Sequence, residues 1–243
     1  MTLTLSPDLD PMAAAERLAR TGRARVSGLL GQGAQTLHAA MTDPDMVWNR
    51  AMRNPYNADV PVAVFEAEPL EEQARLVGMV HQEATDGFQF IFDRLRLGQA
   101  RTMGLPVPQA LYDLHALFNG PAYLDFARRL TGDDRIAYVD AQATRYLPGH
   151  FLNGHTDEHE GAGRLYAYVL NLSPVWRAEW GGLLMFTDPD GQVTETFIPH
   201  CDTLNVFKVP APHAVSMVAP FAAAPRYSIT GWWRVNAPET DQP

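Results

Sequence analysis

The chain has 243 residues, of which 46% are hydrophobic and 19% are charged, and its formal net charge is −9. This composition supports a sizeable core and excludes a disordered tail or a fibrous repeat. The excess of 28 acidic residues over 19 Lys and Arg residues also argues against direct binding of nucleic acid through a basic face.

Membrane and redox signals point to a cytoplasmic protein. No apolar run approaches the ~20 residues that are needed to span a bilayer, so we expect no membrane association. The N-terminal sequence MTLTLSPDLDPM lacks the basic segment and apolar core of a secretory signal. Cys201 is the single cysteine, which excludes an intrachain disulfide and a cysteine-based structural zinc site.

The first part of the chain, residues 1–134, is predicted to be rich in helix. Its clearest pattern spans 70–97, where apolar residues recur at three- and four-residue spacing. Glu71 and Glu72 lie in the first turn of this segment, where the helix dipole favours negative charge. We expect shorter helices at 11–20, 32–41, 108–117 and 121–130, an early strand at 24–30, and a loop at 54–69.

The second part, residues 135–243, consists of short apolar runs separated by Pro, Gly, Asp and Asn, which is typical of strands and turns. We expect strands at about 135–146, 164–172, 182–187, 193–199, 203–209, 213–218 and 226–235. Closely spaced strands of this kind indicate a sandwich or barrel, for which a jelly roll is a common form. The predicted fold class is therefore α+β with a mainly β core, against which the N-terminal helices pack as a buttress within one compact unit.

The strongest chemical signal is the pair His155 and Asp157. Alternate residues of a strand point to the same face, so both side chains could reach one ion. Two histidines and one carboxylate, with the other positions open, form the ligand set of non-haem Fe(II) oxygenases. A His-x-Asp pair also arises by chance, so a third ligand is required. His213 opens a later strand of the same β-rich part and is the candidate, although a lone histidine there is usually a core residue.

The last predicted strand, RYSITGWWR, carries polar residues on one face. Arg226, Ser228, Thr230 and Trp232 alternate with an apolar set on the opposite face. Buried polar groups need partners, and a guanidinium beside a hydroxyl suits a carboxylate that it can bind bidentately. A solvated strand face is the other open interpretation of this pattern.

Four segments in this order, HTD, GRLYAYVLNLSPVWRAEWGGLLMF, PHAVSMV and RYSITGWWR, resemble the prolyl-hydroxylase-like branch of the Fe(II)/2-oxoglutarate oxygenases. The sequence looks closest to the ribosomal-protein prolyl hydroxylase subgroup and its bacterial relatives. The resemblance covers about 146–234 and is specific because the segments occur together. It implies a double-stranded β-helix that uses Fe(II), 2-oxoglutarate and O2.

The resemblance also implies residue roles. Fe(II) would be held by His155, Asp157 and His213, and the distal carboxylate of 2-oxoglutarate by Arg226 and Ser228. Tyr146 matches a tyrosine that reaches the cosubstrate, whereas Asn171 stands where the family often has a second such tyrosine. The segment 219–225 is longer than in compact members and is expected near the mouth of the site. Whether Trp176 and Arg164 contact substrate or support the structure is left open.

The implied reaction is hydroxylation of an unactivated C–H bond with release of succinate and CO2, most simply on a prolyl residue of a protein or peptide. A protein or peptide substrate is thus favoured over a small molecule, and the sequence does not indicate an oligomeric state. Two alternatives remain: a hydroxylase of a free amino acid or other small metabolite, and a non-catalytic jelly-roll binding module.

Overall fold

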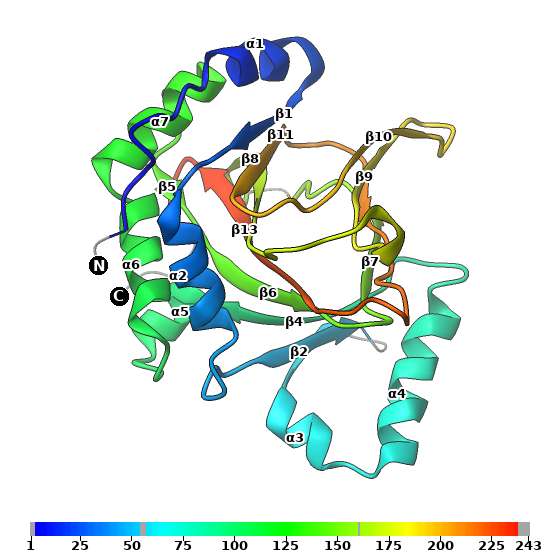
Figure 1. Cartoon of the computed structure of the whole chain (residues 1–243). Helices are drawn as coiled ribbons and strands as arrows, with labels where there is room; N and C mark the ends of the chain where they lie inside the picture. Colours follow the sequence, from blue (N-terminus) through cyan, green and yellow to red (C-terminus); the bar gives the residue numbers. More distant parts are fainter. Residues whose placement is uncertain (1–2, 54–56, 160, 238–243) are drawn as a thin grey trace.

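A curled, largely antiparallel sheet forms the centre of the computed structural model, which describes residues 3–53, 57–159 and 161–237 (Figure 1). The main path of hydrogen-bonded strands is β1-β11-β8-β13-β6-β4-β7-β12-β9-β10, with β2, β3 and β5 attached beside it. The strands are β1 Arg23–Ser27, β2 Asn49–Arg53, β3 Asn57–Pro61, β4 Phe90–Arg96, β5 Tyr138–Val139, β6 Gln142–Tyr146, β7 Phe151–His155, β8 Arg164–Asn171, β9 Leu184–Thr187, β10 Val193–Phe197, β11 Thr203–Lys208, β12 His213–Val215 and β13 Arg226–Arg234. This is the predicted jelly roll.

Helices form two groups around the sheet (Figure 1). They are α1 Met12–Thr21, α2 Gln32–Met41, α3 Val62–Ala67, α4 Leu70–Glu83, α5 Leu97–Thr102, α6 Gln109–Phe118 and α7 Pro121–Thr131, with a short 3-10 helix at Ala178–Trp180. Helices α1, α2 and α5–α7 lie together along one side, and α3 and α4 lie apart from them, below β2 in the view of Figure 1. The main core lies between most of these helices and the sheet. Tyr168, Leu170 and Trp233 face it, whereas Ala167 and Val169 of β8 pack inside the barrel. Strand β8 is thus covered on both sides, as its apolar sequence predicts.

Two predicted elements are wrong. The segment 70–97 is not one helix: α4 ends at Glu83, and Phe90–Arg96 is strand β4 inside the sheet. Gly87 and the alternating aromatic residues that follow it favour a turn and a strand, and this local preference outweighs the continued helical spacing. Within the predicted loop at 54–69, β3 pairs with β2 and α3 follows it, while residues 54–56 lie outside the described residues.

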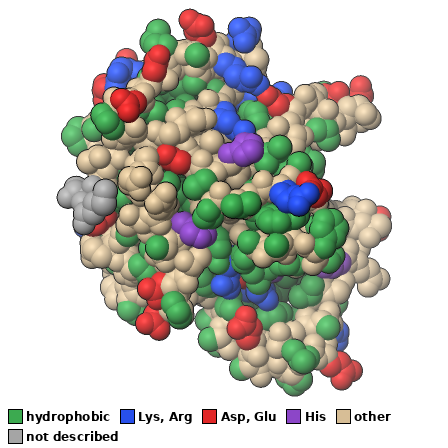
Figure 2. Space-filling view, in the orientation of Figure 1, with side chains coloured by type: hydrophobic (Ala, Val, Ile, Leu, Met, Phe, Trp, Pro, Cys, Tyr) green, Lys and Arg blue, Asp and Glu red, His purple; other side chains and the backbone are tan. Residues whose placement is uncertain are grey.

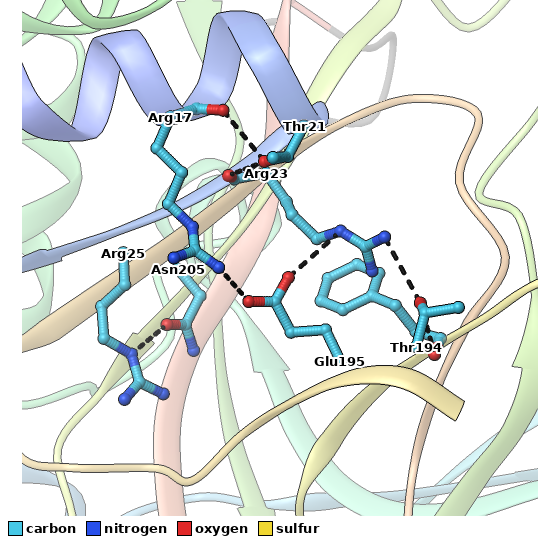
Figure 3. A network of polar contacts seen from close by, with 8 residues as sticks. Arg17, Thr21, Arg23, Arg25, Thr194, Glu195 and Asn205 are labelled. Carbon is cyan, nitrogen blue, oxygen red and sulfur yellow. Dashed lines mark hydrogen bonds and ion pairs between the residues drawn. The ribbon is translucent and has the colours of Figure 1, made fainter.

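Side chains join the two ends of the strand order, β1 and β10 (Figure 3). Glu195 of β10 forms ion pairs with Arg17 of α1 and with Arg23 of β1, the latter at 3.2 Å. Arg25 of β1 donates to the Asn205 side chain on β11 at 2.9 Å and to the Ile198 carbonyl at 2.7 Å. A seam of guanidinium contacts therefore connects these two strands, which lie at opposite ends of the hydrogen-bonded path.

The surface is mixed in character on the face shown in Figure 2. Acidic and basic side chains are interspersed there, and hydrophobic side chains gather around the hollow between the α3–α4 region and the barrel. No helix among the described residues is both long and apolar enough to cross a membrane.

A buried ion-pair network lies on the outer face of the sheet, and we expect removal of its central carboxylate to lower the free energy of unfolding strongly. Asp93 of β4 is 0% exposed, and its two carboxylate oxygens lie 2.9 Å from Arg50 Nε and 2.8 Å from Arg145 Nη2. Asp93→Ala leaves two guanidinium groups without their buried partner, so we expect a loss of about 3–5 kcal/mol in the free energy of unfolding. Urea denaturation measures this loss.

The matched control for Asp93 is Asp125→Ala, which removes an exposed ion pair to Arg129 on α7. Exposed pairs of this kind contribute about 0.3–0.5 kcal/mol. Equal effects of the two substitutions would contradict the assignment of Asp93 as a central structural charge.

Candidate metal centre and carboxylate site

Two histidines from neighbouring strands face one carboxylate. His155 is the last residue of β7, His213 is the first residue of β12, and the two are paired in register. The Asp157 carboxylate lies between them, with Oδ1 3.4 Å from His155 Nε2 and Oδ2 3.5 Å from His213 Nε2. One ligand atom from each residue lies within 4.8 Å of the others, which is close enough for all three to hold a single ion.

The hydrogen bonds of the two imidazoles prepare them as ligands. His155 Nδ1 lies 2.9 Å from the Asn153 carbonyl and His213 Nδ1 lies 2.8 Å from the Ala211 carbonyl. Because a carbonyl oxygen only accepts, each Nδ1 must carry the proton, which leaves the lone pair of a neutral ring on Nε2. Both Nε2 atoms therefore point a free lone pair at the space beside Asp157.

The ionisation states also suit a divalent metal. Burial lowers the pKa of His213 to about 4, so this imidazole is neutral at neutral pH. Burial raises the pKa of Asp157, but its contacts with the His155 and His213 imidazoles outweigh burial, and the net pKa lies below its usual value. Two neutral imidazoles and one carboxylate fit the donor set of non-haem Fe(II).

Asp157 lies beyond the end of strand β7, and not within the strand as predicted. Strand β7 ends at His155, and Asp157 lies beyond it with a positive φ of 61°. The strand alternation expected for the His-x-Asp pair is therefore wrong, although the two side chains do meet. Arg164 Nη1 donates to the Asp157 carbonyl at 3.1 Å, and its guanidinium lies 3.6 Å from the Trp232 ring centroid. Arg164 thus supports the turn that carries the acidic ligand.

A cavity of about 570 Å³ contains this centre. Its walls include all three metal-ligand candidates, Arg226 and Tyr146. Phe88, Phe90 and Phe92 also line it, and sequence reasoning missed them because it placed this segment in a helix. Their spacing of two residues was the signal that could have identified a strand face.

Arg226 is buried without an acidic partner. It is 1% exposed, and among the described residues no carboxylate lies within ion-pair distance of it. Its Nε has no hydrogen-bond partner within that part of the chain, its Nη2 lies 3.4 Å from Asn171 Oδ1, and its guanidinium lies 5.2 Å from the Tyr146 ring centroid. Burial lowers the pKa of Arg226. A buried cation needs compensation, and a ligand carboxylate in the cavity would supply it.

Gly182 makes room for this arginine. It has a positive φ of 61°, and a Cβ at this position would lie 3.1 Å from Arg226 Cδ and 3.3 Å from the Trp176 ring. The second glycine of the Gly181-Gly182 pair is therefore required both by its backbone conformation and by the close approach of Arg226.

The other predicted cosubstrate residues surround Arg226. Tyr146 pairs in register with Arg226, and its ring stacks on Phe92 at 5.0 Å. Burial raises the pKa of Tyr146, so its hydroxyl stays protonated. Ser228 Oγ lies 2.8 Å from Thr144 Oγ1, and Asn171 lies opposite Ser228 on β8. Ser228 and Asn171 are fully buried and do not line the cavity.

The segment 219–225 does not lie at the mouth of the site, which corrects the expectation. None of its residues lines the cavity, and the Ala219 amide donates to the Trp180 carbonyl at 2.9 Å. The reason is the direction of β12, which begins at the candidate ligand His213 and runs away from the His-Asp-His cluster before this segment starts. Trp176 is also outside the cavity lining, where it donates to the Gly181 carbonyl and packs against Trp180.

Comparisons with known proteins identify a family and solved structures to which this chain is similar. Residues 141–234 match the model of the 2OG-Fe(II) oxygenase superfamily, and among curated proteins none matches significantly. A 2OG-Fe(II) oxygenase-family oxidoreductase from Burkholderia pseudomallei is similar with a TM-score of 0.65 and 14% identity, covering 99% of this chain and 97% of that chain. A Pseudomonas putida prolyl-4-hydroxylase has a TM-score of 0.57 and 18% identity, covering 96% and 94%.

A third similar structure is a prolyl hydroxylase from Trichoplax adhaerens in complex with a peptide fragment of the hypoxia-inducible factor oxygen degradation domain. Its TM-score is 0.52 and its identity 15%, covering 92% of this chain and 88% of that chain. At such identities the structural likeness establishes the fold. The double-stranded β-helix with N-terminal helices is thereby confirmed.

Proposed function

We infer that this chain is a 2OG-Fe(II) oxygenase, whose superfamily model matches residues 141–234, and that it hydroxylates a prolyl residue of a protein or peptide. The superfamily implies Fe(II), 2-oxoglutarate and O2 as cofactor and cosubstrates. The observation that carries the proposal is the joint presence, in one cavity, of a His-Asp-His cluster and a buried arginine that has no carboxylate partner in the described part of the chain. The first suits the metal, and the second suits a dicarboxylate cosubstrate.

We assign the metal to His155, Asp157 and His213. The Nδ1 hydrogen bonds to backbone carbonyls hold both rings in the required tautomer and orientation. When bound, Fe(II) together with O2 and 2-oxoglutarate supplies the oxidative chemistry that inserts oxygen into a C–H bond and releases succinate and CO2. The protein needs no side-chain nucleophile for this reaction.

We assign the distal carboxylate of 2-oxoglutarate to Arg226. The guanidinium can donate two parallel hydrogen bonds to a carboxylate, and the low-polarity surroundings strengthen them. Tyr146 lines the same cavity beside Arg226 and is the hydroxyl donor that we assign to the cosubstrate. Ser228 shares the β13 face with Arg226 but lies outside the cavity lining, so the direct contact with this carboxylate that the resemblance implies for its hydroxyl stays a prediction.

A prolyl substrate is supported by the shape and lining of the cavity. Its volume of about 570 Å³ exceeds what a five-carbon dicarboxylate fills, so room remains for part of a substrate. Phe88, Leu152 and Trp232 supply apolar surface suited to a pyrrolidine ring, while Arg94 and Asp59 supply polar contacts of the kind a peptide backbone requires. Two of the similar structures are prolyl hydroxylases, and one of them contains a peptide.

Succinate release tests the proposal. Anaerobically Fe(II)-loaded protein is exposed to O2 and 2-oxoglutarate with prolyl peptides, with the same peptides carrying alanine for proline, or with free proline. We expect stimulation by a prolyl peptide and a mass gain of one oxygen on its proline. Stimulation by free proline alone would favour the small-metabolite alternative. Absence of both succinate and 2-oxoglutarate binding would overturn the enzyme assignment and leave the non-catalytic binding module.

A further inference from the structure

The Asn171 side-chain amide contacts Arg226, and we infer that Asn171 is a positioning residue, fixed by Thr203, which orients the guanidinium for the cosubstrate without touching the cosubstrate itself. This inference rests on the proposed function, because it assumes that Arg226 binds the distal carboxylate. It replaces the direct cosubstrate contact that the sequence resemblance implies for Asn171.

The orientation of the Asn171 amide follows from its partners. Asn171 is 0% exposed and lies opposite Thr203 of β11 on one side and opposite Ser228 of β13 on the other. Its amide nitrogen lies 3.2 Å from the Thr203 carbonyl oxygen and 3.1 Å from Thr203 Oγ1. A carbonyl oxygen only accepts, so the atom facing it must be the NH2 group. The amide oxygen therefore faces Arg226 Nη2 at 3.4 Å.

This arrangement leaves Asn171 no donor for a carboxylate. Both N–H bonds of its amide are directed at Thr203, and its remaining group is an oxygen, which repels an anion. Asn171 also lies outside the cavity lining. Its contribution to cosubstrate binding must then pass through Arg226, whose Nη2 it holds while Nε has no hydrogen-bond partner among the described residues.

Thr203 completes the chain of contacts one strand farther from the cavity. Its hydroxyl accepts from Asn171 and donates to the His200 carbonyl, so its position is fixed from both sides. Thr203 lies outside the cavity lining, which means that a substitution there can affect cosubstrate binding only through Asn171 and Arg226. This separation makes Thr203 the sharper test of the inference.

The experiment compares two ligands of equal chain length, 2-oxoglutarate and 2-oxopentanoate, which carries a methyl group in place of the distal carboxylate. Affinities are measured calorimetrically on the Mn(II)-loaded protein without O2. Asn171→Ala is expected to weaken 2-oxoglutarate binding about tenfold, and Thr203→Val about threefold, because each loses hydrogen bonds that fix a charged group. Neither is expected to change 2-oxopentanoate binding, and kcat at saturating 2-oxoglutarate should stay near the unsubstituted value.

Asn205→Ala is the matched control. Asn205 is an equally buried amide on β11, two residues from Thr203, but its amide oxygen accepts a hydrogen bond from Arg25 instead of one from Arg226. It should bind both ligands like the unsubstituted protein. Thr203→Val preserves side-chain shape, so a folding defect of Asn171→Ala does not remove the test.

Two results would overturn the inference. Equal weakening of both ligands by Asn171→Ala would show a role unrelated to the distal carboxylate, and unchanged 2-oxoglutarate affinity in Thr203→Val would show that the Thr203 hydroxyl does not fix Asn171. If the unsubstituted protein itself showed no preference for 2-oxoglutarate over 2-oxopentanoate, the assignment of Arg226 under the proposed function would fall together with this inference.

Discussion

Asp157→Ala is expected to abolish metal binding and succinate formation together. Asp157 is the carboxylate that both histidines face, at 3.4 and 3.5 Å, and the only anion among the three candidate ligands. Loss of a group that merely orients a metal ligand typically costs about 10- to 100-fold in affinity or activity. Loss of the charged ligand itself should therefore exceed about 100-fold. Co(II) binding, followed by its visible absorption, and 2-oxoglutarate turnover measure the two effects independently.

The control for this prediction is a histidine outside the cavity. His81 lies on α4, and its Nε2 is 3.0 Å from the Gly149 carbonyl. His81→Ala should leave Co(II) binding and turnover close to those of the unsubstituted protein. An Asp157→Ala protein that still bound Co(II) tightly and released succinate at the original rate would contradict the metal assignment.

The sequence was most informative where alternation and chemistry agreed. In β13 the alternation of two faces predicted which side chains enter the barrel, and Arg226 and Ser228 are indeed buried opposite the apolar residues that face the helices. The ordered segments that resemble the oxygenase family also identified the three residues that the structure brings together at one point. Local periodicity sufficed here because the side-chain period of a strand is fixed by its backbone.

The sequence was least informative where long-range contacts decide the backbone. The helical spacing after Glu83 continues in the sequence, but pairing of β4 with β6 and β7 turns Phe90–Arg96 into a strand. Asp157 likewise has a positive φ just beyond the end of β7, where Arg164 donates to its carbonyl and where β7 pairs in register with β12. At β4 this pairing acts together with the local strand preference of Gly87 and the alternating aromatic residues, whereas no single-sequence pattern indicates the backbone conformation of Asp157.

The buried charge of Arg226 is expected to lower the stability of the free protein while it binds the cosubstrate. Substitution by methionine should separate these two effects. The free protein carries this guanidinium in its core with no carboxylate partner from residues 3–53, 57–159 or 161–237, whereas the proposed cosubstrate supplies one. Arg226→Met keeps a long side chain and removes the unpaired charge. Removing an incompletely satisfied buried polar group relieves a penalty of about 1–3 kcal/mol, so we expect the free protein to become more stable by up to that amount.

The same substitution should eliminate stabilisation by the cosubstrate. A ligand that binds only the folded state raises its stability by RT ln(1 + [L]/Kd), so a Kd raised about 100-fold removes most of the shift in melting temperature that 2-oxoglutarate produces. Mn(II) should still stabilise Arg226→Met, because His155, Asp157 and His213 are unchanged. Thermal melts with Mn(II) alone and with added 2-oxoglutarate give both numbers. A variant that is less stable when free, yet is stabilised by 2-oxoglutarate as strongly as the unsubstituted protein, would show that Arg226 is a structural cation and that the carboxylate binds elsewhere.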